Sequence, residues 1–113
     1  MSRADQARFS DPDPAPVFAA LGDPTRLSLL MKLSDGRTRS IATLAVNTKL
    51  TRQAVTKHLR VLEHAGLVSS VRIGRESRFA YRPERIAGAK SFLDTVSAQW
   101  DDALTRLRSF VEG

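Results

Sequence analysis

The segment of residues 51–65 restricts the fold of this 113-residue chain more than any other. At about 100° per residue, Val55, Leu59 and Leu62 fall within an arc of about 60°, which is typical of an amphipathic helix with one buried face. A separate arc of about 140° contains Arg52, Gln53, Thr56, Lys57 and Arg60. Such side chains contact bases and phosphates in DNA-binding proteins, although a charged helix face is also often simply solvated.

An alternating stretch follows this helix. In residues 71–73 and 77–82, apolar side chains alternate with arginines on either side of a 74–76 loop. This predicts a β-hairpin with one apolar face, one basic face and Arg75 at its tip. A helix–turn–helix followed by a basic hairpin describes a winged helix, whose recognition helix enters the major groove while the hairpin contacts the DNA backbone. The predicted DNA-binding residues are Thr51, Arg52, Gln53, Thr56, Lys57 and Arg60 on the helix, and Arg72, Arg75 and Arg78 on the hairpin.

Three shorter helices are expected before the recognition helix. They cover residues 17–21, a segment that begins at Asp23-Pro24, and a segment capped by Ser40 that ends at Ala45. Residues 1–16 are polar and rich in proline near their end, so we expect a flexible arm there. The predicted architecture is mainly α with a small β-hairpin, in the order α-α-α-α-β-β-α, and it forms a single domain over residues 17–113.

The last predicted helix covers residues 87–111 and carries a long apolar stripe. A winged-helix core can cover only part of such a stripe, so we expect a second copy of the chain to cover the rest. The alternative is that this helix folds back on its own core. The predicted dimer interface consists of Val17, Phe18, Leu21, Phe92, Val96, Trp100, Leu104 and Leu107.

Composition narrows the classes of function. The chain has 18 basic and 12 acidic residues, a net charge of +6 and no cysteine. The basic excess lies mainly in residues 51–82 and favours nucleic acid as the partner. We find no glycine-rich phosphate loop and no plausible nucleophile–base–acid set, so we do not expect an enzyme or a cofactor. The sequence has neither a membrane-length apolar run nor a signal-peptide core, which predicts a cytoplasmic protein without a membrane partner.

Three stretches resemble the ArsR/SmtB family of bacterial winged-helix repressors. Residues 20–27 (ALGDPTRL) resemble its opening signature, residues 51–68 (TRQAVTKHLRVLEHAGLV) its recognition helix, and residues 74–82 its wing. The resemblance covers about residues 17–111. It implies a homodimer that binds double-stranded operator DNA, blocks transcription, and is released by a signal.

The metal-sensing pattern of that family is missing from this chain. Metal-sensing members carry a Cys-x-Cys or similar ligand set where this chain has residues 41–46 (IATLAV), and others use histidines on the last helix, where this chain has none. His58 and His64 point about 120° apart on one helix, so they are not expected to share a metal ion. His58 lies at the edge of the buried arc and is interpreted as a packed or interface histidine. The tail, with Trp100 followed by Leu104 and Leu107, looks more like the metal-independent branch of the family.

We predict a sequence-specific, dimeric repressor whose operator is an imperfect palindrome. A non-specific architectural DNA-binding protein and a winged helix used for protein interaction remain as alternatives. The effector, if there is one, is a small molecule of unknown identity. Its expected site is the apolar seam between residues 17–21 and 92–100.

Overall fold

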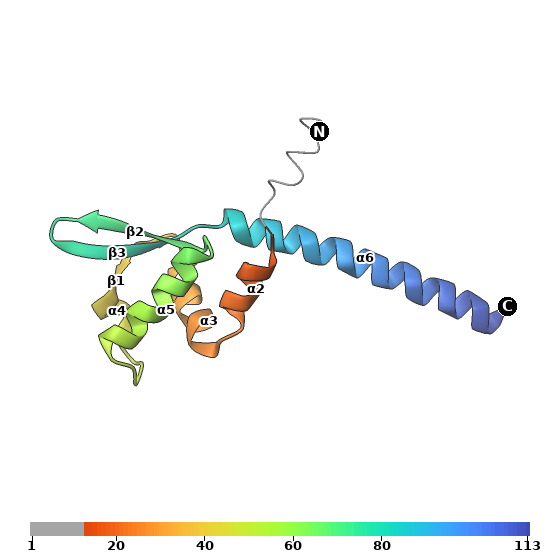
Figure 1. The fold of residues 1–113 in the computed structure, drawn as a ribbon, viewed down its shortest axis with the longest axis horizontal. Coiled ribbons are helices and arrows are strands. Elements are labelled where there is room, and N and C mark those ends of the chain that lie inside the picture. The colour runs from red at the N-terminus through yellow and green to blue at the C-terminus, as the bar shows by residue number, and fades with distance from the viewer. Residues whose placement is uncertain (1–12) are drawn as a thin grey trace, which may run out of the picture.

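The computed structural model describes residues 13–113 and forms a winged helix-turn-helix (Figure 1). Residues 1–12 of the predicted arm (residues 1–16) lie outside the described residues, whereas its last two residues, Ala15 and Pro16, belong to the first described helix, so the arm prediction is wrong for those two. The helices are α2 (Ala15–Leu21), α3 (Pro24–Leu33), α4 (Ile41–Ala45), α5 (Arg52–His64) and α6 (Glu84–Glu112). The strands are β1 (Arg39–Ser40), β2 (Val68–Ile73) and β3 (Glu76–Tyr81). The predicted fold class is confirmed.

Local capping explains where the central helices begin and end. The side chains of Asp23, Ser40 and Thr51 accept hydrogen bonds from backbone N–H groups of the first turn of α3, α4 and α5. Helix α5 ends before Gly66, whose φ of 81° suits glycine. Helix α2 begins two residues earlier than predicted, because a proline such as Pro16 is tolerated in the first helical turn.

The hairpin differs from the prediction in its register. Ile73 lies opposite Glu76 across a two-residue turn of Gly74 and Arg75, whereas a three-residue loop is expected from the sequence. A register change of one residue moves every side chain of a strand to the other face. Val71 is therefore paired with Arg78 on one face, and the prediction of one apolar face and one basic face is wrong.

Strand β1 is not predicted from the sequence, because it is only two residues long. It pairs antiparallel with β3 and gives the sheet order β1-β3-β2. Arg39 lies opposite Phe79, and Ser40 lies opposite Arg78. This short strand joins the start of α4 to the hairpin and so fixes the hairpin beside the helix-turn-helix.

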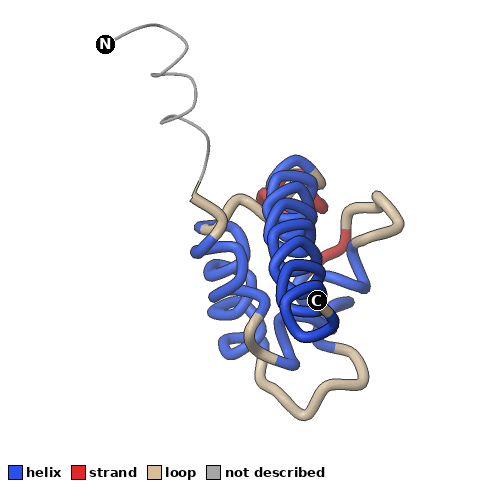
Figure 2. The backbone as a smooth tube through the Cα atoms, turned by 90° about the vertical axis from the view of Figure 1, so that its right-hand side faces the viewer, coloured by secondary structure: helices blue, strands red, loops and turns tan. Residues whose placement is uncertain are grey.

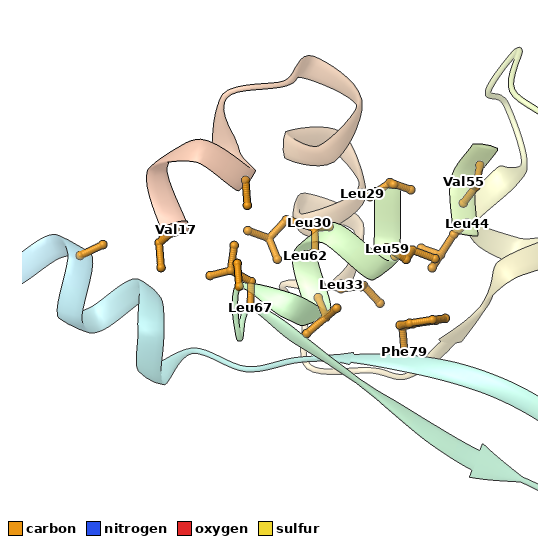
Figure 3. Packing of buried hydrophobic residues seen from close by; sticks show 14 residues of the cluster. Val17, Leu29, Leu30, Leu33, Leu44, Val55, Leu59, Leu62, Leu67 and Phe79 are labelled. Atoms are coloured by element: carbon orange, nitrogen blue, oxygen red, sulfur yellow. The ribbon is translucent and has the colours of Figure 1, made fainter. Parts of the chain in front are cut away.

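The core lies between α3, α4, α5 and the base of the hairpin (Figure 3). Leu33, Leu59, Leu62 and Phe79 have no exposed surface at all. Val17 belongs to this core as well, because α2 turns it inward, and only 1% of its surface is exposed. Its predicted role as a dimer contact is therefore wrong, since no surface remains for a partner to cover.

Helix α6 extends away from the rest of the domain as a single straight rod (Figures 1 and 2). It has 29 residues, and Ala89 is its one buried residue. Near its start, the ring centroids of Phe92 and of Phe18 from α2 lie 6.1 Å apart. The alternative in which this helix folds back on its own core is wrong. Its N-terminal end at Glu84 precedes the prediction by three residues, because Pro83 serves as the N-cap.

Candidate nucleic-acid interface

Helix α5 separates an apolar face from a polar face, as its periodicity predicts. Val55, Leu59 and Leu62 are completely buried against the core. Arg52, Gln53 and Lys57 are exposed on the opposite side. The helix therefore contributes to the stability of the domain with one face and leaves its cationic face available to a ligand.

A groove of about 470 Å³ joins the polar face of α5 to the tip of the hairpin. Arg52, Gln53 and Thr56 line one side, and Arg75 lines the other. The tertiary structure thus brings together four of the predicted site residues from two separate elements. The start of α4 lines the groove as well, through Ser40, Ile41 and Ala42. These three residues are not predicted from the sequence, because nothing in their side-chain chemistry points to DNA.

Two threonines of the predicted set also have local roles. The Thr51 hydroxyl oxygen accepts a hydrogen bond from the backbone N–H of Ala54 at 3.1 Å. The Thr56 hydroxyl donates to the Arg52 carbonyl oxygen at 2.7 Å. A hydroxyl that donates one bond still has lone pairs with which to accept another. Thr56 therefore offers an acceptor and a methyl group to the groove, while Thr51 mainly caps α5.

Arg60 links α5 to the hairpin. Its Nη1 donates to Glu63 Oε1 at 2.7 Å and to Ser70 Oγ at 3.2 Å, and its guanidinium carbon lies 5.5 Å from the centre of the Phe79 ring. Hydrogen bonds that the Glu63 carboxylate accepts lower its pKa below the usual value. The bond from the Ser70 hydroxyl has the largest effect, and the bond from Arg60 has the next largest. The carboxylate therefore contributes to stability at neutral pH, and this contribution is lost as the pH falls through the lowered pKa.

Arg78 lies on the opposite face of the hairpin from Arg72. Its Nε and Nη2 donate to the Thr38 side-chain and main-chain oxygens at 3.0 and 2.9 Å, and its Nη1 contacts Glu76 at 2.8 Å. Its guanidinium is thus occupied in joining the hairpin to the segment before β1. Arg72 is exposed and makes one long hydrogen bond to the Gly74 carbonyl oxygen at 3.4 Å. Arg72 and Arg75 therefore remain the better candidates for backbone contacts from the hairpin.

His58 is packed between helices, in agreement with its interpretation from the sequence. Its Nδ1 lies 3.4 Å from Arg26 Nη1 and 3.9 Å from Asp23 Oδ2. Accepting the Arg26 backbone N–H is the main reason that the pKa of Asp23 lies below its usual value. His64 is exposed on the far end of α5. Within residues 13–113, no three histidine or carboxylate side chains gather closely enough to hold a metal ion.

The far half of α6 exposes apolar side chains to solvent. Trp100, Leu104 and Leu107 are each more than half exposed, and Phe110 is 84% exposed. The remaining members of the predicted interface lie nearer to the domain, where Phe18, Leu21 and Val96 are partly buried and Phe92 is 46% exposed. No helix in the described part of the chain is both apolar enough and long enough to span a bilayer.

Comparison with known proteins identifies the family. A family model described as "Bacterial regulatory protein, arsR family" matches residues 23–70. The HTH-type transcriptional regulator YuzN of Bacillus subtilis is 43% identical over 65 residues, which cover 52% of this chain and 71% of that protein. The chain belongs to the ArsR family. It is therefore a DNA-binding transcriptional regulator and not an enzyme.

Solved structures of ArsR proteins share the fold of most of this chain. An ArsR-like transcriptional regulator from Rhodococcus sp. RHA1 has a TM-score of 0.75 and 34% identity, and the match covers 92% of this chain and 95% of that one. The cadmium metal-sensor CmtR from Mycobacterium tuberculosis has a TM-score of 0.51 and 40% identity over 59% of this chain and 68% of its own. ArsR relatives of this chain thus include a metal sensor.

Proposed function

We propose that this ArsR protein is a sequence-specific, homodimeric repressor that inserts α5 into the major groove of its operator. The observation that carries the proposal is the groove in which Arg52, Gln53 and Thr56 face Arg75. Side chains on a helix read base edges in the major groove, and a basic hairpin beside it contacts phosphates. On this basis Arg52, Gln53, Thr56 and Lys57 contact bases, while Arg60, Arg72 and Arg75 contact the DNA backbone.

The exposed stripe on α6 supports the homodimer. A second copy related by a twofold axis would bring the same apolar surface to each α6 and cover both stripes at once. The two α5 helices would then enter major grooves on one side of the duplex. The operator is accordingly an imperfect palindrome with half-sites about 10 base pairs apart.

A signal other than a metal ion would release the operator. The chain has no cysteine, and residues 87–113 contain no histidine. His58 already contacts Asp23 and Arg26. These features favour the metal-independent branch, although the family includes CmtR. A repressor of this kind acts in the cytoplasm.

DNase footprinting on the region upstream of the protein's own gene tests the proposal, with competition by bulk genomic DNA. A protected, two-part palindromic site that resists the competitor supports a sequence-specific repressor. Uniform coverage that the competitor removes would instead indicate an architectural DNA-binding protein. A lack of DNA affinity even at low salt would indicate that the winged helix binds another protein instead.

Replacing Gln53 by alanine is expected to change which operator the protein prefers. A bidentate contact to a base contributes about 1–3 kcal/mol of discrimination, so preference for the operator over a variant at that position should fall roughly 5- to 150-fold. Competition binding with single-base operator variants measures this change. Equal losses on operator and random duplex would show that Gln53 does not contact a base.

Replacing Arg75 by alanine is expected to weaken binding to all DNA sequences by a similar factor. A lost phosphate contact lowers the slope of log affinity against log salt by about one. Titrations at several salt concentrations measure this slope. Arg108→Ala serves as the matched control, because Arg108 lies at the far end of α6 and pairs with Glu112. An unchanged slope in the Arg75 variant would contradict the phosphate contact.

A further inference from the structure

A second groove, of about 630 Å³, lies between α5 and α2. Small or apolar side chains from both helices line it, and these are Pro16, Ala19, Ala20, Val61 and Ala65. Alanines at facing positions leave a hollow that longer side chains would have filled. The volume falls within the roughly 300–1,000 Å³ that is usual for small-molecule sites. The groove does not coincide with the seam between residues 17–21 and 92–100 that is expected from the sequence.

All of the charged or titratable side chains that line this second groove are basic. They are Arg26, Lys57, Arg60 and His64. Arg26 is held in place because its Nε donates to the Ala20 carbonyl oxygen at 2.6 Å and its Nη2 to the Ala19 carbonyl oxygen at 3.3 Å. Arg60 is partly neutralised by Glu63. Lys57 is exposed and has no hydrogen-bond or ion-pair partner within residues 13–113.

We propose that the second groove binds a small amphipathic carboxylate, with its apolar chain along the alanines and its carboxylate at Lys57. An apolar floor beside an unmatched cation selects against both neutral polar molecules and cations. The proposal rests on the proposed function in one respect, because it supplies the non-metal signal that the repressor requires. Binding itself depends only on the geometry of the free protein.

The position of Lys57 couples this site to DNA. Lys57 belongs to the predicted DNA-binding set, and it also lines the second groove. A carboxylate paired with Lys57 neutralises one cation of the DNA-facing surface. DNA affinity should therefore fall when the carboxylate binds, and by linkage DNA should lower carboxylate affinity by the same factor.

Calorimetric titration of the intact protein with decanoate, decanol and decyltrimethylammonium tests the site. We expect decanoate to bind about tenfold or more tightly than decanol, since a charge-assisted contact is added, and the cation not to bind. Decanoate should lower operator affinity. Ala19→Phe, which fills the groove from an exposed helix position, should abolish binding, while Ala98→Phe on the exposed surface of α6 should not. Lys57→Gln should remove the preference for decanoate over decanol.

Several results would overturn this inference. Equal affinity for decanoate and decanol would show that Lys57 does not bind the carboxylate. Undiminished decanoate binding by Ala19→Phe would show that the ligand binds outside the second groove. If Ala19→Phe alone becomes monomeric, a second copy covers the groove, and if it loses DNA affinity without decanoate, DNA occupies the groove. Decanoate binding by a protein that does not discriminate operator from random duplex would reject the proposed function but leave the site intact.

Discussion

Trp100→Glu is expected to give a folded monomer that has lost most of its affinity for a palindromic operator. Trp100 is 64% exposed in the single chain, so a carboxylate there does not disturb the winged-helix domain. Between two α6 helices the same carboxylate would lie unpaired among apolar side chains, which costs several kcal/mol. Loss of the dimer removes simultaneous binding to two half-sites, worth about 10²- to 10⁴-fold in affinity.

Light scattering after size exclusion measures the mass of this variant, and circular dichroism its helix content. Ala98→Glu is the matched control, because Ala98 is exposed and lies about 160° from Trp100 around the α6 axis. The control should remain dimeric and bind the operator normally. A Trp100 variant that remains dimeric at micromolar concentration would show that the far half of α6 is not the dimer surface.

Phe79→Ala is expected to lower the free energy of unfolding by about 3–5 kcal/mol. Phe79 is fully buried in β3, packs beneath the Arg60 guanidinium, and lies opposite Arg39 in the β1–β3 pairing. Its removal leaves a cavity where the hairpin meets α5. Since small domains are stable by only about 5–15 kcal/mol, this loss is a large share of the free energy of unfolding, and DNA binding should weaken at physiological temperature.

Thermal and urea unfolding measure this effect, with a drop in Tm of at least about 12 °C expected. Ile73→Ala is the control on the same hairpin, because Ile73 is 53% exposed. Its effect should stay below about 1 kcal/mol. Similar losses from the two substitutions would show that Phe79 is not a central core residue and would contradict the packing seen in Figure 3.

The recognition helix could be predicted closely from the sequence. The spacing of Val55, Leu59 and Leu62 depends only on the period of an α-helix, and the Thr51 cap and the Gly66 stop lie within a few residues of the helix they delimit. These signals are local, so they identify both the helix and its polar face. The apolar stripe on α6 follows from the same periodicity.

The roles of the hairpin arginines could not be predicted in the same way. One residue in the turn decides whether Val71 shares a face with Phe79 or with Arg78, and the alternating pattern is compatible with either. In the folded chain, the Arg78 guanidinium donates a hydrogen bond to Thr38, which is 40 residues away in the chain. Val17 shows the same limitation, because an apolar helix position does not reveal whether its own core or a second copy covers it.

The amino-acid sequence by itself determined the central helices and the caps at which they begin, because helical periodicity and capping depend on contacts within a few residues. Tertiary structure decided which side chains share a groove. Arg52 and Arg75 line one groove, and Ala19 and Ala65 line another. These residues come together only because α2, α5 and the hairpin pack on a common core. Such contacts between distant residues depend on the shape of that core, which no local pattern encodes.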